Sequence, residues 1–317
     1  MNADVVRLRQ TALASTLRSL FVLGTPRARK RATPYFLLVP ILLLLGSLLF
    51  VPEMIAFGYS TTHYTLGEAP TFVGASNYVT LVHDPAFWNS VLVTLIFVLT
   101  TVSGQMVLGL AFALLVNREF RGRNILIAVL MSPFAISPAA AAVMWKTLFS
   151  TDFGLINFAL TGFGYRMSDF PWLTDPVLAL PAVIVVEIWM ETPFVFLLLY
   201  ASIRGLPKEP FEAASIDGAS SWQKLQYLTL PMIRPAIIVA AVFRAVYSLR
   251  SFGQIYILTG GGPDGATDVL SLYLYRQAFR YFDFGLASAT AWLMLAMAIL
   301  LTAELVRRLH RATQEAD

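Results

Sequence analysis

The stretch EAASIDGASSWQKLQYLTLP, Glu212–Pro231, lies between two long apolar runs and decides the fold class. It carries Glu212, Asp217 and Lys224, and such charged side chains are costly inside a bilayer. It is also unlike the mixture of Gly, Ser and Pro that is typical of an idle loop. The stretch therefore predicts an ordered, helix-prone polar segment between two membrane spans.

The composition supports this interpretation. Of the 317 residues, 57% are hydrophobic and 13% are charged, whereas about a quarter of the residues in a soluble domain are charged. A span needs about 20 apolar residues, and it must be helical because an open strand edge leaves backbone groups unpaired in lipid. We expect an all-α integral membrane protein with six transmembrane helices, at Tyr35–Phe57, Phe87–Val116, Ile125–Phe149, Val177–Ala201, Met232–Leu258 and Phe284–Val306.

The positions of Lys and Arg indicate the orientation, because cytoplasmic loops carry an excess of them. Seventeen lie in the two tails and in the connections after the second and fourth spans, against three in the loops opposite. Both termini and the quoted stretch are therefore expected in the cytoplasm, and this asymmetry explains the net charge of +4 better than a basic patch for nucleic acid does. The expected parts are a basic N-terminal tail (1–33), a six-span domain (34–309) containing the polar segment 202–231, and a C-terminal tail (310–317).

The N-terminal tail does not resemble a cleavable signal peptide, because its polar part is too long and a full span follows it. Its apolar residues, with arginines between them, fit either an amphipathic helix on the inner leaflet or a disordered tail.

Several kinds of chemistry are missing from the sequence. It has no G-x-x-x-x-G-K-[ST] phosphate loop, no G-x-S-x-G element and no cysteine. Its three histidines, His63, His83 and His310, have no metal-ligand spacing. We therefore expect no catalytic residue, no metal site and no cofactor in this chain, and no enzymatic activity of its own.

The polar segment has its own start and stop signals. Pro207 and Pro210 interrupt a helix continuing from the fourth span. Gly218 is expected to end a first short helix, Ser220 or Ser221 to cap a second, and Pro231 to begin the fifth span. Two short helices joined by a turn would make a rigid projection on the cytoplasmic surface. An ordinary interfacial connection is the alternative.

Glu212-Ala213-Ala214, then Gly218, then Leu228, Leu230 and Pro231, resemble the EAA motif of the binding-protein-dependent ABC importer permeases. The family usually has Ile where this chain has Leu228. The resemblance extends over about residues 35–308. Two segments are similar to the carbohydrate-importing subgroup of this family: WMETPFVFLLLYASIRGLPKEPFEAASIDGAS (Trp189–Ser220) and IYILTGGGPDGATDVLSLYLYRQAF (Ile255–Phe279). Within that subgroup the chain resembles the maltose/glycerol-phosphate type, and the first of its two paired permeases.

This resemblance implies that the projection is a coupling helix that docks on a separate ATPase subunit, where ATP and Mg²⁺ are bound. It implies a second permease subunit, two ABC ATPase subunits, an extracytoplasmic solute-binding protein and a di- or oligosaccharide substrate, all at a bacterial cytoplasmic membrane and without nucleic acid. The residues to which it assigns the coupling role are Glu212, Ala213, Ala214, Asp217, Gly218, Leu228 and Pro231.

Ionisable residues inside spans indicate function by default. Glu187 and Glu191 share one face of the fourth span, and Arg244 and Ser248 share one face of the fifth. A Glu191–Arg244 pair that only joins two helices is one interpretation, and a polar wall for sugar hydroxyls is the other. The resemblance implies a substrate path of Met190, Glu191, Phe194, Arg244, Ser248 and Ser251, where Arg244, Tyr247, Ser248 and Ser251 would form one helical stripe.

The resemblance does not identify the substrate, because many relatives have Phe-Asp where this chain has Phe252-Gly253. A neutral sugar is favoured, since Glu191 would repel an anion; an anionic substrate of the glycerol-phosphate type is the alternative. A stand-alone secondary transporter would use an ion gradient through the intramembrane charges, and usually shows internal repeats that this sequence lacks. A membrane scaffold would have no need of those charges.

Overall fold

The computed structural model describes residues 26–314, so the amphipathic-helix interpretation of the N-terminal tail lies outside the described residues. The described part of the chain forms two compact units, which divide between Ile55 and Ala56. Helix α2 (Pro26–Ser60) starts in the first unit and includes residues that were expected to belong to the tail. At the other end, α14 (Phe284–Gln314) continues beyond the expected limit at Val306.

In the described part of the second unit the regular structure is helical apart from one small hairpin, in which β1 (Thr62–His63) pairs antiparallel with β2 (Thr71–Phe72). Its further helices are α3 (Ser76–His83), α4 (Pro85–Asn117), α5 (Arg123–Met131), α6 (Pro138–Leu148), α7 (Leu155–Thr161), α8 (Ala179–Arg204), α9 (Glu209–Ile216), α10 (Ser221–Lys224), α11 (Leu230–Leu249), α12 (Gly253–Leu258) and α13 (Leu270–Phe279). Two 3₁₀ turns, Ser132–Ala135 and Met167–Asp169, and a π-helical turn, Leu225–Thr229, complete the described secondary structure.

Within the described residues, five helices are long and apolar enough to cross a membrane: Leu38–Ser60, Pro85–Asn117, Ala179–Arg204, Ser221–Leu249 and Phe284–Glu304. A sixth crossing is present if Arg123–Ala135 and Pro138–Leu148, which are bent by 101°, count as one broken span. The predicted fold class is therefore confirmed.

The third predicted span, Ile125–Phe149, is wrong in its continuity. Pro133 lies in the 3₁₀ turn that follows α5, and Pro138 is the first residue of α6. Neither proline has an N–H to continue a helix. Ser137 is extended, and its hydroxyl caps α6 by accepting a hydrogen bond from the Ala140 N–H at 3.3 Å. The two prolines and this cap divide the span into two helices.

The fifth predicted span, Met232–Leu258, is wrong at both ends. It begins at Ser221, because α10, the π-helical turn and α11 are one continuous helix to Leu249, and Pro231 lies inside that helix. At the other end, the N–H groups of Arg250 and Ser251 bond to carbonyls three residues back, which tightens and ends the helix. The chain resumes as the separate helix α12 at Gly253.

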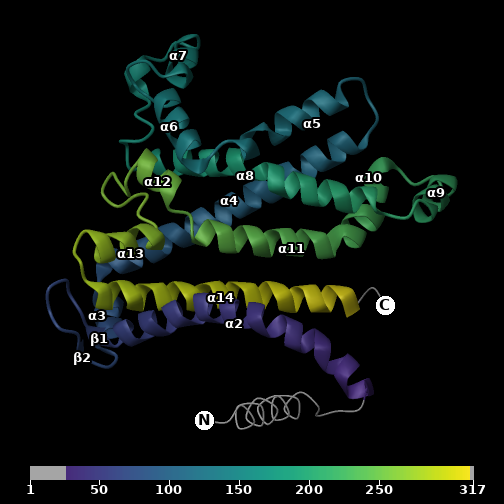
Figure 1. Cartoon of the computed structure of the whole chain (residues 1–317). Helices are drawn as coiled ribbons and strands as arrows, with labels where there is room; N and C mark the ends of the chain where they lie inside the picture. Colours follow the sequence, from purple (N-terminus) through teal and green to yellow (C-terminus); the bar gives the residue numbers. More distant parts are fainter. Residues whose placement is uncertain (1–25, 315–317) are drawn as a thin grey trace, which may run out of the picture. The chain divides into compact units, whose positions relative to one another are not determined.

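The long helices α4, α8 and α11 pack against one another, and α14 packs along α11 (Figure 1). One apolar cluster includes Phe97, Val183 and Leu249, and a second includes Val116 and Phe196. The α3, α12 and α13 segments lie at one end of this unit, while α9 projects at the other (Figure 1). This separation agrees with the predicted orientation, since the connection containing α9 was expected inside.

Helix α4 approaches α8 closely at Gly109, where a Cβ atom would lie 2.6 Å from Val195 Cγ1 and 3.0 Å from the Phe196 backbone nitrogen. Small residues allow such approaches between membrane helices. We expect Gly109→Ala to force the helices apart and to destabilise the folded protein by about 1–3 kcal/mol, the usual cost of overpacking. Gly58→Ala is the control, because its Cβ would meet nothing within 4 Å. The measurement is the monodisperse fraction after heating in detergent, and equal curves for the two variants would contradict the close-approach argument.

Orientation can be tested cleanly because the sequence contains no cysteine. Ser76 and Asp264 are exposed near the end expected outside, and Ser220 is exposed in the segment expected inside. In intact cells, an impermeant thiol reagent should label Ser76→Cys and Asp264→Cys but not Ser220→Cys. Labelling of Ser220→Cys from outside would reverse the assigned topology.

Candidate functional site

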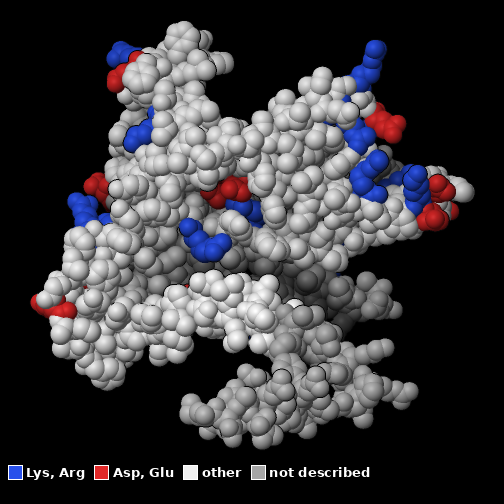
Figure 2. Space-filling view, in the orientation of Figure 1, with Lys and Arg blue, Asp and Glu red and all other residues white. Residues whose placement is uncertain are grey.

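A buried polar cluster joins α4, α8, α11 and α12 in the middle of otherwise apolar helices. Its members Gln105, Glu187, Arg244 and Gln254 are each no more than 4% exposed. Charged residues are otherwise sparse on the middle of the face in Figure 2, where red and blue atoms lie together among white ones. Burial of an arginine and a glutamate at such a place requires that their hydrogen-bonding groups be satisfied within the protein.

Arg244 is the centre of the cluster and donates from three nitrogens. Its Nη2 lies 3.1 Å from Glu187 Oε1, and its Nη1 lies 2.7 Å from Glu191 Oε2. Its Nε donates to Gln105 Oε1 at 2.9 Å. A planar guanidinium presents its donors in a fixed fork, so these contacts fix both the position and the plane of the group. Arg244 is therefore held between α4 and α8, with its charge compensated.

Glu187 connects the cluster to the break after α11. The Gln254 amide of α12 donates a hydrogen bond to Glu187 Oε2, and the Ser251 hydroxyl lies 3.5 Å from the same oxygen. The Gln105 amide donates to the Glu187 carbonyl at 3.3 Å. The interrupted end of α11 and the start of α12 are thus anchored on α8.

The cluster contains two carboxylates and one guanidinium, and the two carboxylates differ in accessibility. The Glu191 side chain is 22% exposed, against 6% for Glu187. Glu191 is consequently the charged member that reaches accessible surface. A carboxylate in this position can accept hydrogen bonds from ligand hydroxyl groups while Arg244 holds it from behind.

The six residues of the predicted substrate path divide into two groups. Glu191, Phe194 and Ser251 retain accessible surface, whereas Met190, Arg244 and Ser248 are buried in this conformation. The predicted stripe on the fifth span is wrong for Ser251, because the helix ends at Leu249. Arg244, Tyr247 and Ser248 do share one side of α11, where the Arg244 guanidinium lies 5.7 Å from the Tyr247 ring centroid. Ser248 lies 3.4 Å from the Thr101 hydroxyl of α4, and Phe194 lies beside Phe243 with ring centroids 6.2 Å apart.

Gln105 and Gln254 were not predicted as members of the site. Each is a neutral amide inside an apolar segment, so neither registers as an intramembrane charge. A buried amide nevertheless needs partners, and the polar character of both residues was the available signal.

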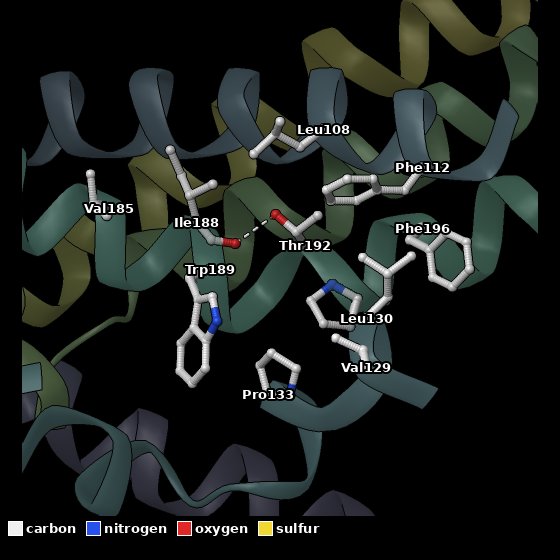
Figure 3. A pocket seen from close by; sticks show the side chains of 11 residues that line it. Leu108, Phe112, Val129, Leu130, Pro133, Val185, Ile188, Trp189, Thr192 and Phe196 are labelled. Carbon is white, nitrogen blue, oxygen red and sulfur yellow. Dashed lines mark hydrogen bonds between the residues drawn. The ribbon is translucent and has the colours of Figure 1, made fainter. Parts of the chain in front are cut away.

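A separate pocket of about 460 Å³ lies between α4, α5 and α8 (Figure 3). Trp189, Pro133 and Phe112 are among its apolar lining residues. The Thr192 hydroxyl donates to the Ile188 carbonyl at 2.6 Å and is thereby engaged (Figure 3). With such a lining the pocket suits apolar groups and gives sugar hydroxyls few partners.

The predicted coupling residues lie on and beside the projection made by α9 and α10. Helix α9 ends in a Schellman motif, in which Ala219 N–H bonds to the Ala214 carbonyl at 2.9 Å and Gly218 N–H to the Ser215 carbonyl at 3.2 Å. Gly218 has a left-handed backbone, with φ +77°, and it ends the first short helix as predicted. Ser220 and Gln223 form a capping box, which confirms the predicted cap of the second helix. Lys224 Nζ donates to Ser215 Oγ at 2.7 Å and ties the two helices together.

The surface of this projection combines acidic and apolar groups. The residues Glu212, Ala213, Asp217, Gly218 and Pro231 are exposed, and Ala214 and Leu228 are half-buried. Three large apolar side chains that were not assigned to the coupling role are also exposed: Ile216 (88%), Trp222 (69%) and Tyr227 (68%). Large exposed apolar side chains on a rigid support are typical of a protein-binding surface.

The chain matches a known protein family and several of its members. The family described as "Binding-protein-dependent transport system inner membrane component" matches residues 30–314. The chain is 35% identical to the trehalose/maltose transport system permease protein MalF of Thermococcus litoralis, over 86% of this chain and 92% of the relative. It is 30% identical to the sulfoquinovosyl glycerol transport system permease protein SmoG of Agrobacterium fabrum, over 87% and 90% of the two chains.

A solved structure also resembles the chain. A bacterial ABC transporter involved in the import of the acidic polysaccharide alginate superimposes with a TM-score of 0.77 and 24% identity, over 90% of this chain and 99% of that chain. The fold is therefore that of an ABC importer permease. This chain belongs to the family of binding-protein-dependent transport system inner membrane components, as a multi-pass ABC permease and not as the ATPase.

Proposed function

We propose that this permease passes a neutral di- or oligosaccharide through the membrane, after delivery by an extracytoplasmic solute-binding protein. The observation that carries the proposal is the accessible Glu191 carboxylate, held by a charge-compensated Arg244. Relatives at 30–35% identity are named for transport of trehalose/maltose and of sulfoquinovosyl glycerol, which supports a sugar.

In this proposal the path residues have different roles. Glu191 and Ser251 accept or donate hydrogen bonds to sugar hydroxyls, and Phe194 offers a ring face. Arg244 is a positioning residue, because its donors are already engaged by Glu187, Glu191 and Gln105. Met190 and Ser248 form the layer behind this surface and become part of the path only where α8 and α11 separate. A site with a few fixed polar groups among aromatic rings is what saccharide recognition requires.

An anionic substrate of the glycerol-phosphate type is the second candidate, and a specific residue favours it. Arg250 is exposed at the end of α11, and its guanidinium lies 5.2 Å from the Tyr247 ring centroid. No ion pair involves Arg250 among the described residues. A free guanidinium on an aromatic ring could bind a sulfonate or phosphate. The cluster has two carboxylates but one guanidinium, so the accessible Glu191 carboxylate would repel an anion. We therefore prefer the neutral sugar.

We also propose the assembly and the division of the chain. Residues 34–309 form the transmembrane domain, and the segment 202–231 docks on an ATPase through Glu212, Ala213, Ala214, Asp217, Gly218, Leu228 and Pro231. A second permease and two ATPase subunits that bind ATP and Mg²⁺ complete the importer, with 1–33 and 310–317 as cytoplasmic tails. The exposed acidic and apolar groups of the projection support this role.

The test is uptake into proteoliposomes by the complete importer, with trehalose, maltose and glycerol 3-phosphate as substrates. We expect ATP- and binding-protein-dependent uptake of a neutral disaccharide, and a reduction of roughly tenfold per assembled complex in Glu191→Gln, equal to about 1.4 kcal/mol. Arg250→Ala should leave uptake of the neutral sugar largely intact. Uptake of glycerol 3-phosphate that Arg250→Ala abolishes would establish the anionic alternative. Uptake driven by an ion gradient without ATP would instead indicate a secondary transporter.

A further inference from the structure

Four aromatic side chains form a continuous row at the extracytoplasmic end of the second unit. They are Phe252, Tyr256 of α12, and Tyr275 and Phe279 of α13, which we call the aromatic row. Phe252 stacks on Tyr256 with ring centroids 5.4 Å apart, and the Tyr275 centroid lies 4.9 Å from that of Phe252. Tyr275 is also 5.4 Å from Tyr256 and 5.2 Å from Phe279.

Phe252 packs against the apolar core, whereas the other three rings of the aromatic row are not part of that cluster. Helix α13 buries Leu270 and Tyr273 on one face, whereas Tyr275 and Phe279, four residues apart, lie on another. Tyr256 and Phe279 are 48% and 63% exposed. The aromatic row therefore presents accessible ring surface on a support that other residues hold in place.

The aromatic row begins next to Ser251, a residue of the proposed sugar path. Phe252 follows Ser251, whose hydroxyl faces Glu187 and whose carbonyl accepts a hydrogen bond from the Ser271 hydroxyl at 2.6 Å. Ser271 lies one turn before Tyr275 on the same face of α13. Path and row are thus linked through the break between α11 and α12.

The chemistry of the aromatic row fits a saccharide better than a lipid chain. Every member is aromatic, and ring faces attract the polarised C–H groups of a pyranose because their π-systems carry negative charge on the face. The row also has phenolic hydroxyls, and a hydrogen bond with Tyr256 raises the pKa of the Tyr275 phenol. An aliphatic surface would serve acyl chains equally well and would need no hydroxyl groups.

We propose that the aromatic row is a saccharide-binding subsite, which receives sugar rings from the binding protein before they reach Glu191. This inference rests on the proposed function, because it presumes that the transported molecule is a saccharide. Since several rings lie in sequence, the subsite is expected to contribute more to a longer saccharide than to a disaccharide.

The experiment measures uptake of maltose and maltotriose by the complete importer as a function of loaded binding-protein concentration. Tyr256→Ala, Tyr275→Ala and Phe279→Ala should each raise KM at least threefold, with the larger effect on maltotriose, while kcat stays within a factor of two. Tyr275→Phe keeps the ring and should remain close to wild type. Phe163→Ala is the matched control, because Phe163 is 80% exposed on another loop of the same side and lies outside the row.

The outcomes separate the possible occupants. If the alanine variants lose the second permease during purification, the row is a subunit interface and the subsite is refuted. If KM is unchanged but thermal stability becomes dependent on the lipid composition, the row is a lipid contact and the subsite is again refuted. If the wild-type importer transports neither saccharide, it is the proposed function that fails, and the subsite fails with it.

Discussion

Arg244→Ala is expected to remove most of the folded protein from the membrane. The substitution leaves the carboxylate of Glu187, whose side chain is 6% exposed, facing that of Glu191 without the cation between them. Breaking a buried ion pair by removing one partner costs about 3–5 kcal/mol, which is a large part of the total stability of most proteins. The measurement is the amount of membrane-inserted, detergent-soluble protein relative to wild type.

Two further variants make this result specific to the buried cluster. Arg250→Ala removes an exposed arginine six positions later and should leave the protein abundant. The triple variant Glu187→Gln, Glu191→Gln, Arg244→Met removes all three charges at similar volume, and it should recover much of the lost abundance because no charge remains unpaired. Normal abundance of Arg244→Ala alone would show that the site is solvated, and that Arg244 is free to act on the substrate directly.

Gly218→Val is expected to reduce uptake below a tenth of wild type while the protein stays in the membrane. Gly218 has φ +77°, and a left-handed backbone costs a residue with a side chain roughly 1–2 kcal/mol, more when it is β-branched. No atom lies within 4 Å of the added Cβ, so the effect arises from the backbone and not from a clash. The altered turn would move α9 relative to α10 and disturb the proposed docking of the ATPase.

The controls separate the backbone effect from the loss of a glycine. Asn tolerates the left-handed region, so Gly218→Asn should retain most of the uptake. Gly205→Ala changes a glycine with an ordinary φ of −84° and should behave like wild type. ATPase co-purification and uptake are measured for each variant. A Gly218→Val protein that binds the ATPase and transports normally would remove the coupling role from this turn.

The sequence predicted the features that depend on neighbouring residues. The end of the first short helix at Gly218 and the cap of the second at Ser220 each follow from a local rule, and the structure bears them out. The break in the third predicted span was missed because composition over the whole segment was given more weight than its local signals. Pro133 and Pro138 were visible as helix breakers, but the apolar composition from Ile125 to Phe149 outweighed them.

The buried cluster could not be predicted from local sequence patterns, because its contacts join residues far apart in the sequence. Arg244 and its partner Gln105 are 139 residues apart, and Glu187 and Gln254 are 67 apart. No periodicity within one helix indicates which faces of α4, α8 and α12 meet. The Glu191–Arg244 pair was foreseen because both residues are charged, whereas the neutral amides that complete the cluster were not.

The continuous helix from Ser221 to Leu249 has a mechanical consequence. With a rise of about 1.5 Å per residue, its cytoplasmic end lies roughly 34 Å from Arg244, on the same rod. A torque applied at Ser221 therefore reaches the ion cluster without passing through a loop that could absorb it. The π-helical turn at Leu225–Thr229 is a departure from regular α-helical winding along this rod. A small change of winding there would rotate the rest of the helix about its axis. This turn therefore determines how much of a rotation at Ser221 reaches Arg244.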